Sequence, residues 1–264
     1  MSPHLAAEHV ALGYDQGGVI CDDLSLSIPE GGFTAIVGPN GCGKSTLLRC
    51  LAGVLTPRAG RVVLDGRPLP RYRPKEVSRR IGLLPQSSLA PDGITVVDLV
   101  ARGRISHQGL FQQWRVADEA AVEKALRATR LLDHREEQVR ELSGGQRQRV
   151  WIAMLLAQET PLLLLDEPTT YLDIAYQCEV LELLARLHAA GKTVVTVLHD
   201  LNQAARYATM MVVMKKGAIV AQGTPEEVLT ESLVREVFGI DCLVSPDPVT
   251  GTPSISPRRP GLSS

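Results

Sequence analysis

Residues 38–46 read GPNGCGKST and directly follow the short apolar run FTAIV at residues 33–37. They satisfy the pattern G-x-x-x-x-G-K-[ST], and the run KSTLLRCLAGV that begins at Lys44 has the composition of a helix. A strand, a glycine-rich turn and a helix in this order form a cradle for phosphate groups, because glycines let backbone amides approach phosphate oxygens and the helix N-terminus attracts anions. The alternative, a glycine-rich turn with a chance lysine, is disfavoured by this context.

The residues of this turn divide into those that shape the cradle and those that carry a charge or a hydroxyl group. Lys44 can place its ammonium group against the β and γ phosphates of a nucleotide, and Ser45 can offer its hydroxyl to Mg²⁺. Cys42 is either a tolerated small side chain or, as a sharper hypothesis, a site where alkylation blocks nucleotide binding. The predicted nucleotide contacts in this turn are Gly38, Pro39, Asn40, Gly41, Cys42, Gly43, Lys44, Ser45 and Thr46.

The composition is that of a globular protein with one large domain or two small ones. The chain has 264 residues, of which 44% are hydrophobic and 22% charged, and its formal net charge is −1. This charge gives no electrostatic case for nucleic acid as a partner. Five cysteines without a C-x-x-C spacing fit reduced cytosolic thiols better than disulfides or zinc. The sequence shows neither a signal peptide nor an apolar run of about 18 residues, so we expect a cytoplasmic chain.

Short apolar runs bounded by turns predict an α/β fold with a buried, largely parallel sheet. Helical stretches separate several of these runs, which places helices on both sides of the sheet. Shorter β-like runs before residue 33 predict a further β region. The expected strands of the buried sheet, besides residues 33–37, are IGLL at 81–84, LLLLD at 162–166, TVVTVL at 193–198 and MVVM at 211–214, and RVVLDG at 61–66 is hairpin-like.

The pattern changes between Ser88 and Gln158, where no strand is expected. The segment VADEAAVEKALRATRLL places its apolar residues on one helical stripe, so we predict an all-helical insertion over about residues 88–160. The end of the chain, SPDPVTGTPSISPRRPGLSS, has five prolines and few bulky apolar residues. We therefore expect one domain over residues 1–243 and a flexible, proline-rich tail over residues 244–264.

Two adjacent acids, Asp166 and Glu167, follow the apolar part of the strand LLLLD. A carboxylate at a strand end can bind Mg²⁺ through its water shell, and the next one can orient an attacking water, so we assign Asp166 to the metal and Glu167 to the water. His199 follows another strand, and beside a phosphate cradle we expect it to contact γ-phosphate or the water rather than to be merely structural. The catalytic candidates are thus Glu167, His199, Gln86 and Lys44, and the metal ligands are Ser45, Gln86 and Asp166.

Gln86, which follows IGLL, is the weakest of these candidates when it is taken alone. Its amide could reach Mg²⁺ or the attacking water, but it could equally close a loop. Residues 142–149, LSGGQRQR, form a second glycine turn that opens a helix, without a lysine. Ser143 can cap that helix and present its hydroxyl group, while Gly144 and Gly145 expose amides to an anion.

The set GPNGCGKST, Gln86, LSGGQ, LLLLDE, YLD and His199, in this order, resembles the ATPase subunits of ABC transporters over about residues 5 to 240. The resemblance implies a P-loop NTPase core of the RecA-like type with an N-terminal antiparallel β subdomain and an inserted all-helical subdomain. It also implies ATP and Mg²⁺ as cofactors, and two subunits packed head to tail. Each LSGGQ then faces the nucleotide on the partner's P-loop, which explains why this second turn has no lysine of its own.

The same resemblance assigns further residues to the nucleotide. The turn would contribute Ser143, Gly144, Gly145 and Gln146, and Asp173 is similar to an interface acid that senses the opposite site. Tyr171 departs from the usual wording of that segment, where a small residue precedes Leu-Asp. Tyr14 matches the aromatic residue that stacks on adenine, worth about 1–3 kcal/mol by analogy with base stacking; a turn tyrosine without a ligand is the alternative.

Several sequence segments, among them PDGITVVDLVARGR and DPVTGTP, are similar to those of the ferric-siderophore branch of this family, which includes haem and cobalamin uptake systems. The resemblance implies an importer subunit at the cytoplasmic face of the membrane, separate integral membrane permease subunits, and a periplasmic or lipoprotein substrate-binding protein. An importer of haem, cobalamin or another cargo is the alternative. A soluble ABC ATPase acting on nucleic acid, or a P-loop kinase, is disfavoured by the single motif set and by LSGGQ with His199.

Overall fold

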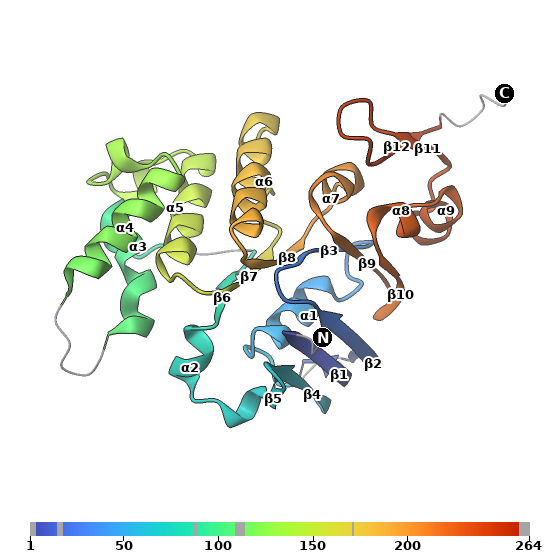
Figure 1. Ribbon diagram of the computed structural model, residues 1–264, viewed down its shortest axis with the longest axis horizontal. Helices are drawn as coiled ribbons and strands as arrows, with labels where there is room; N and C mark the ends of the chain where they lie inside the picture. Colours follow the sequence, from blue (N-terminus) through green and yellow to red (C-terminus); the bar gives the residue numbers. More distant parts are fainter. Residues whose placement is uncertain (1–3, 15–17, 87–88, 109–113, 171, 259–264) are drawn as a thin grey trace. The chain divides into compact units, whose positions relative to one another are not determined.

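The computed structural model describes residues 4–14, 18–86, 89–108, 114–170 and 172–258. It consists of two compact units (Figure 1). The first combines Met1–Leu69 with Thr193–Ser264, and the second is Pro70–Lys192. Among the described residues, none of the helices combines the length and the apolar character that crossing a membrane requires.

In the described part of the first unit, helix α1 (Lys44–Leu51) packs against one strand from each of two sheets. One sheet is antiparallel, in the order β2-β1-β4-β5, as predicted for the N-terminal β region. In the other, β3 lies between β8 and β9 and is parallel to both, while β10 is antiparallel to β9. The strands are β1 (Leu5–Gly13), β2 (Val19–Ile28), β3 (Phe33–Val37), β4 (Ala59–Leu64), β5 (Arg67–Pro68), β8 (Thr193–Val197), β9 (Met210–Lys215) and β10 (Ala218–Gly223).

The C-terminal part of the first unit is ordered, which corrects the expectation of a flexible tail for residues 244–258. Strands β11 (Cys242–Pro246) and β12 (Pro253–Pro257) form an antiparallel hairpin that lies beside helix α7 (Leu201–Tyr207) (Figure 1). The prolines do not prevent this pairing, because they stand at strand ends and so remove few ladder hydrogen bonds. Helices α8 (Pro225–Val228) and α9 (Glu231–Phe238) connect β10 to the hairpin.

The second unit joins a pair of parallel strands to a helical layer. Strand β6 (Ile81–Leu84) pairs in parallel with β7 (Leu162–Asp166), and both coincide with the predicted segments. Helices α3, α4 and α5 surround an apolar core that includes Val100, Leu126 and Val150. Within the described part of residues 88–160 there is no strand after β6, only an isolated bridge between Thr95 and Gln138. The helices are α2 (Pro74–Ser78), α3 (Val96–Ala101), α4 (Val116–Ala128), α5 (Gly144–Ala157) and α6 (Ile174–Ala189), with 3₁₀ turns at η1 (Leu69–Arg71), η2 (Arg102–His107), η3 (Leu132–His134) and η4 (Val139–Glu141).

Candidate functional site

The loop between β3 and α1 needs glycine at both of its ends. Gly38 has φ +153°, and a Cβ there would lie 2.2 Å from the carbonyl oxygen of Met214 on β9. Gly43, directly before α1, has φ +102°, and its Cβ would lie 2.9 Å from the side chain of Ile20. A larger residue at either position would push the neighbouring strand away. The glycines of the sequence pattern therefore fix a tight turn that leads from the sheet into the helix.

The ammonium group of Lys44 lies over this loop. Its Nζ donates hydrogen bonds to the carbonyl oxygens of Gly38 at 2.8 Å and Pro39 at 3.0 Å, and Lys44 is only 5% exposed. An ammonium group has three N–H donors, so the third can serve a phosphate oxygen. The first turn of α1 adds backbone amides without acceptors inside the helix, together with the hydroxyl groups of Ser45 and Thr46. The loop thus has the donors of a phosphate site.

Tyr14 lies at the end of β1 and is 43% exposed. Its hydroxyl oxygen accepts a hydrogen bond from Nη1 of Arg49 at 3.2 Å, and Arg49 belongs to α1. The helix that begins at the phosphate loop therefore also holds the exposed ring. This arrangement is suited to stacking on a base whose phosphates enter the loop.

His199 leaves the sheet beside the loop. Strands β3 and β8 are parallel with Ile36 opposite Val197, and the amide of Leu198 donates to the carbonyl oxygen of Ile36 at 3.1 Å. The carboxyl ends of parallel strands meet at one edge of a sheet, so His199 follows β8 at the edge where residues 38–43 follow β3. The side chain of His199 is exposed there.

In the second unit, Gln86 and Glu167 follow the neighbouring strands β6 and β7. Nε2 of Gln86 donates to Oε2 of Glu167 at 2.7 Å, and Oγ1 of Thr170 donates to the same oxygen at 3.2 Å. Glu167 is 8% exposed and has φ +53°, a backbone conformation that non-glycine residues adopt at a cost. Asp166, the last residue of β7, is buried. The structure therefore places both predicted acids and Gln86 at one strand edge.

The second glycine turn is a capped helix start. Oγ of Ser143 accepts from the amide of Gln146 at 3.2 Å, and Oε1 of Gln146 accepts from the amide of Ser143 at 2.9 Å. This reciprocal capping leaves the exposed Gly144 and the partly exposed Gly145 in the first turn of α5, where helix amides and the helix dipole favour an anion. The cap on α5 expected from the sequence is thus present.

Comparisons with known proteins identify this combination of turns. The family model described as ABC transporter matches residues 21–170. The ferric enterobactin transport ATP-binding protein FepC of Escherichia coli is 53% identical over 96% of this chain and 93% of its own length. A Bacillus subtilis protein that carries the name "Probable siderophore transport system ATP-binding protein YusV" is 51% identical over 97% of this chain and 94% of its own length. The chain belongs to the ABC transporter family.

Solved structures agree with this family and with the predicted P-loop fold. A chain of an inward-facing ABC transporter assigned to the metal-chelate type superposes with a TM-score of 0.83 at 30% identity, with 98% of each chain covered. The ABC transporter cassette MJ0796, solved as a dimer, superposes with a TM-score of 0.75 at 28% identity and covers 83% of this chain and 98% of its own. The same cassette with ADP and phosphate gives a TM-score of 0.74 at 27% identity, with the same coverage of both chains.

The ABC signature turn, Leu142–Gln146, rests on helix α6. A Cβ on Gly145 would lie 3.3 Å from the ring of Tyr176 on α6, and the guanidinium of Arg149 on α5 lies 4.9 Å from the centre of that ring. Gln148 on α5 donates to the carbonyl oxygen of Pro168 at 3.2 Å, directly after Glu167. The signature helix is therefore fastened to the segment that carries the predicted base.

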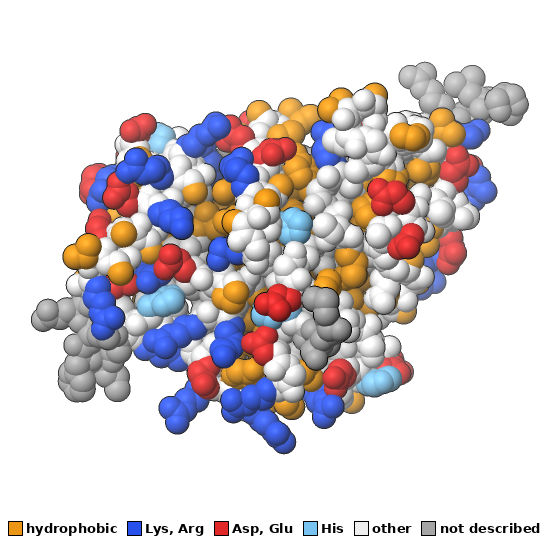
Figure 2. Space-filling view, viewed as in Figure 1, with side chains coloured by type: hydrophobic (Ala, Val, Ile, Leu, Met, Phe, Trp, Pro, Cys, Tyr) orange, Lys and Arg blue, Asp and Glu red, His pale blue; other side chains and the backbone are white. Residues whose placement is uncertain are grey.

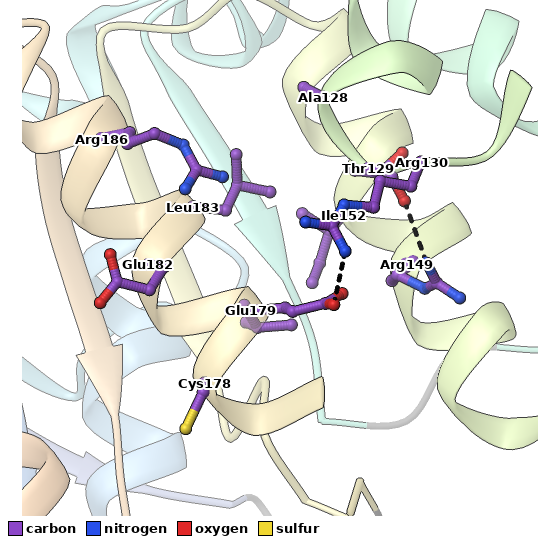
Figure 3. A pocket seen from close by; sticks show the side chains of 11 residues that line it. Ala128, Thr129, Arg130, Arg149, Ile152, Cys178, Glu179, Glu182, Leu183 and Arg186 are labelled. Atoms are coloured by element: carbon purple, nitrogen blue, oxygen red, sulfur yellow. Dashed lines mark hydrogen bonds and ion pairs between the residues drawn. The ribbon is translucent and has the colours of Figure 1, made fainter. Parts of the chain in front are cut away.

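A cavity of about 230 Å³ lies between the end of α4 and helices α5 and α6 (Figure 3). Nη1 of Arg130 donates to Oε1 of Glu179 at 2.7 Å, and Arg149 reaches the carbonyl oxygen of Thr129 at 3.5 Å. These bonds join the end of α4 to α6 and α5. Residues that line the cavity thus hold α5, which begins at the signature turn, to its neighbouring helices.

Asp173 caps α6 in this structure. Its Oδ1 accepts from the amide of Tyr176 at 3.0 Å, and its side chain lies at an exposed position. The neighbouring Tyr171, which departs from the family wording, lies outside the described residues. Asp173 therefore has a local structural role, and its role toward an opposite nucleotide stays a prediction.

The first unit has four buried thiols, which belong to Cys21, Cys42, Cys50 and Cys242. Cys42 packs under the loop, where a Cβ on Gly38 would lie 2.9 Å from its Sγ. Burial raises the pKa of the Cys42 thiol, although the nearby Lys44 opposes the shift. Burial and the neighbouring thiols raise the pKa of Cys21 and of Cys50 to about 11 each, and burial also raises the pKa of Cys242. Of the two readings of Cys42, the structure favours a small side chain that fills space.

Each unit collects part of the predicted set. The first holds Tyr14, the phosphate loop, Lys44, Ser45 and His199, and the second holds Gln86, Asp166, Glu167, Asp173 and the signature turn. Sequence reasoning missed three supporting residues, Thr170, Gln148 and His134. His134 Nε2 lies 3.1 Å from Nε2 of Gln146, so the histidine supports the capping glutamine. The partners of Gln148 and His134 are 20 and 12 positions away and depend on the fold, whereas the partner of Thr170 is only 3 positions away in a turn for which we recognised no motif.

Proposed function

We propose that this chain is the ATP-hydrolysing subunit of an ABC importer that takes up ferric siderophores through a separate permease. The observation that carries hydrolysis is Glu167, a buried carboxylate directly after β7 that Gln86 and Thr170 hold in one orientation. The cargo class rests on the relatives, whose names assign them to ferric enterobactin and other siderophores.

Each unit by itself carries oxygen donors of the kind that a magnesium nucleotide requires. Ser45 offers a hydroxyl group and Asp166 a carboxylate, and Gln86 retains its carbonyl oxygen because its nitrogen serves Glu167. These are hard oxygen ligands of the kind that Mg²⁺ prefers. When bound, Mg²⁺ neutralises negative charge on the phosphates. Lys44, the loop amides and Tyr14 would hold the phosphates and the base of ATP.

Hydrolysis then depends on the positioning of the attacking water and the γ-phosphate more than on a covalent intermediate with the protein. Glu167 accepts a proton from a water molecule, the water oxygen forms a bond to the γ-phosphorus, and the bond from that phosphorus to the bridging oxygen of ADP breaks. His199 stands at the sheet edge beside the phosphate loop, where it can donate to a γ-phosphate oxygen. Lys44 stabilises the charge that develops on the phosphate oxygens.

Two copies are needed to complete each site. The signature turn presents a capped helix start but no lysine of its own, so it suits a triphosphate already bound to the lysine loop of a second copy. The dimeric MJ0796 cassette supports such pairing. Only a ligand with γ-phosphate would bridge both surfaces, so hydrolysis would release them. A head-to-tail homodimer is the simplest assembly, since one chain carries the whole motif set.

The second unit offers a surface for the permease. A cavity of about 560 Å³ between α2, η2 and α5 is lined by Lys75, Arg102, Met154 and the exposed Ile105. Residues 71–80 carry five basic side chains and one acid, and Figure 2 shows Lys and Arg gathered over α2 at the lower left of this face. An amphipathic helix with carboxylates on its polar side would fit this surface. Docking there would place the chain peripherally at the cytoplasmic face of the membrane.

Uptake in cells tests this function. In three separate strains, the gene for this chain would replace the ATPase gene of a ferric-enterobactin importer, of a haem importer and of a cobalamin importer, and each strain would be offered the cargo of its own permease. We expect uptake of the iron chelate only, and none with Glu167→Gln. The purified Glu167→Gln protein should bind ATP but release phosphate at least about a hundredfold more slowly. Near-normal phosphate release would refute the role of Glu167, and uptake of haem or cobalamin alone would refute the cargo.

A further inference from the structure

The C-terminal hairpin is bound to α7 through both the nitrogen and the oxygen of one side-chain amide. Nδ2 of Asn202 donates to the carbonyl oxygen of Ile255 at 3.2 Å, and Oδ1 of Asn202 accepts from the amide of Ile255 at 2.7 Å. Ile255 lies in the middle of β12 and is buried. The asparagine thus takes the place of a neighbouring strand for one residue of β12. Two hydrogen bonds from one side chain fix the direction of that side chain as well as its distance.

The same asparagine is held on its backbone side by the residue that follows His199. Oδ1 of Asp200 accepts from the amide of Asn202 at 2.8 Å and from the amide of Gln203 at 2.9 Å, which makes Asp200 the N-cap of α7. The chain from β8 therefore passes through His199 and Asp200 into a helix start that the hairpin holds. The hairpin's anchor, Asn202, is only three positions after His199 in the chain.

A second anchor lies one helical turn further along α7. Nη2 of Arg206 is 3.0 Å from Oδ2 of Asp247, and positions four apart lie on the same face of a helix. Asp247 also organises the hairpin turn, because its Oδ1 accepts from the amides of Val249 and Thr250 at 2.9 Å each. These backbone hydrogen bonds, with Arg206, lower the pKa of Asp247 to about 2, so this anchor stays charged at neutral pH.

We infer that the C-terminal hairpin, acting through Asn202, positions His199 for ATP hydrolysis. The helix start after His199 is short, since α7 has 7 residues, and a helix of this length is marginal without tertiary contacts. The hairpin supplies those contacts on the face that carries Asn202 and Arg206. Asn202 is a positioning residue: its amide group binds the backbone of Ile255, and through the start of α7 it limits the directions from which His199 can approach γ-phosphate. This inference rests on the role of His199 in the proposed function.

The test compares Asn202→Ala with Gln222→Ala. Both replace an exposed amide of the first unit by a methyl group, but Gln222 lies on β10, away from α7. For Asn202→Ala we expect kcat for ATP to fall at least about tenfold with KM changed less than about twofold, because misplacement affects the reacting geometry and leaves the loop and Tyr14 intact. Gln222→Ala should match the unchanged protein in both constants. Arg206→Ala, which loosens the second anchor, should give a smaller loss of kcat.

An NMR readout separates this inference from the proposed function. With ¹³C-labelled histidine, the imidazole signal of His199, assigned through His199→Ala, should shift or broaden in Asn202→Ala, while the signal of His134 in the second unit stays unchanged. An unperturbed His199 signal together with an unchanged kcat would overturn the inference. Unchanged turnover in His199→Ala would instead contradict the role of His199 in the proposed function, and the NMR signal would still decide whether the hairpin controls the orientation of His199. Thermal unfolding of each variant confirms that the folded protein is compared.

Discussion

Gln86 and Glu167 are joined by a hydrogen bond of 2.7 Å between amide Nε2 and carboxylate Oε2, although 81 positions separate them in the chain. An ionised carboxylate only accepts hydrogen bonds, so the amide must present its nitrogen to Glu167 and keep its oxygen for another partner. The loop after β6 thereby controls the orientation of the group that we propose as the base. A change at Gln86 should therefore appear in the proton chemistry of Glu167.

The variant Gln86→Glu tests whether residue 86 influences the protonation of Glu167. It would place two carboxyl groups at hydrogen-bond distance, where they cannot both ionise without strong repulsion, so one proton would be shared and an apparent pKa of the pair would rise. A base must be unprotonated to act, so we expect the acid limb of the kcat profile to move to higher pH. Steady-state phosphate release between about pH 5.5 and about pH 9 measures it.

Gln86→Ala is the matched control for that experiment, because it removes the hydrogen bond without adding a carboxyl group. Its kcat should fall, but the acid limb should not move upward as in Gln86→Glu. If both variants gave the same pH profile, the contact between Gln86 and Glu167 would have no influence on proton transfer.

The five thiols should differ sharply in reactivity. Cys178 is exposed on α6, while the other four are buried, and burial raises the pKa of Cys21 and of Cys50 to about 11. Near neutral pH these two groups carry almost no thiolate, which is the reactive form. We expect a maleimide to modify Cys178 first and with little loss of ATPase activity. Peptide mass spectrometry against a time course, with Cys178→Ser as control, tests this. Rapid modification of Cys42 in the folded protein would contradict it.

The parts of the site that the sequence predicted well are those in which local geometry demands particular residues. The loop of residues 38–46 is such a case, because Gly38 and Gly43 stand where a Cβ would strike a neighbouring strand. The strands β6 and β7 coincide with apolar runs between turns, since buried parallel strands must be apolar on both faces. Ser143 was also predictable, because capping depends on residues only three positions apart.

The C-terminal hairpin could not be predicted from composition. Five prolines suggested a flexible tail, whereas Pro246 and Pro253 face each other as the pair that flanks the hairpin turn, and the side chain of Asp247 binds amides of that turn. The decisive partner, Asn202, lies 53 positions before Ile255 and carries no motif. Likewise, nothing near Gln86 marked its bond to Glu167, since only the pairing of β6 with β7 brings them together.

Ser143→Asp separates capping from nucleotide binding at the signature turn. Aspartate caps helices as well as serine does, so stability should change by less than about 0.5 kcal/mol. The added negative charge would, however, face the triphosphate on the other copy, and we expect turnover to fall at least about tenfold through repulsion at close range. Denaturant unfolding and phosphate release give the two readouts.

Thr224→Asp provides the control for that charge. Thr224 caps α8 with the same reciprocal pattern, its Oγ1 accepting from the amide of Glu227 at 3.4 Å. The variant should keep both stability and turnover, because α8 carries none of the predicted nucleotide contacts. Equal turnover in Ser143→Asp and Thr224→Asp would show that Ser143 serves only the helix and not the nucleotide.

The helical part of the second unit contains a buried ion pair. Nε of Arg104 donates to Oδ1 of Asp118 at 2.9 Å, each side chain is 6% exposed, and Nη1 of Arg104 also donates to the carbonyl oxygen of Ala157 at 2.8 Å. Burial would raise the pKa of Asp118, but the hydrogen bonds from Arg104 and the Arg115 amide together lower it below its usual value. The pair therefore joins η2, α4 and the end of α5 as a charged unit.

Arg104→Met should destabilise the protein by about 3–5 kcal/mol, because it leaves the Asp118 carboxylate buried without its cation. Arg127→Met, which breaks the exposed pair with Glu123 on α4, should cost less than about 0.5 kcal/mol. The pKa of Asp118 is depressed in the folded protein, so the stabilisation from Arg104 is present above about pH 4 and is lost as the pH falls through the folded pKa. Urea unfolding at several pH values should therefore show the gap between Arg104→Met and the unchanged protein narrowing in acid. A gap that stayed constant from neutral pH to acid would mean that Arg104 stabilises the helices through its hydrogen bond to the carbonyl oxygen of Ala157 and not through its ion pairs with Asp118 and Glu159.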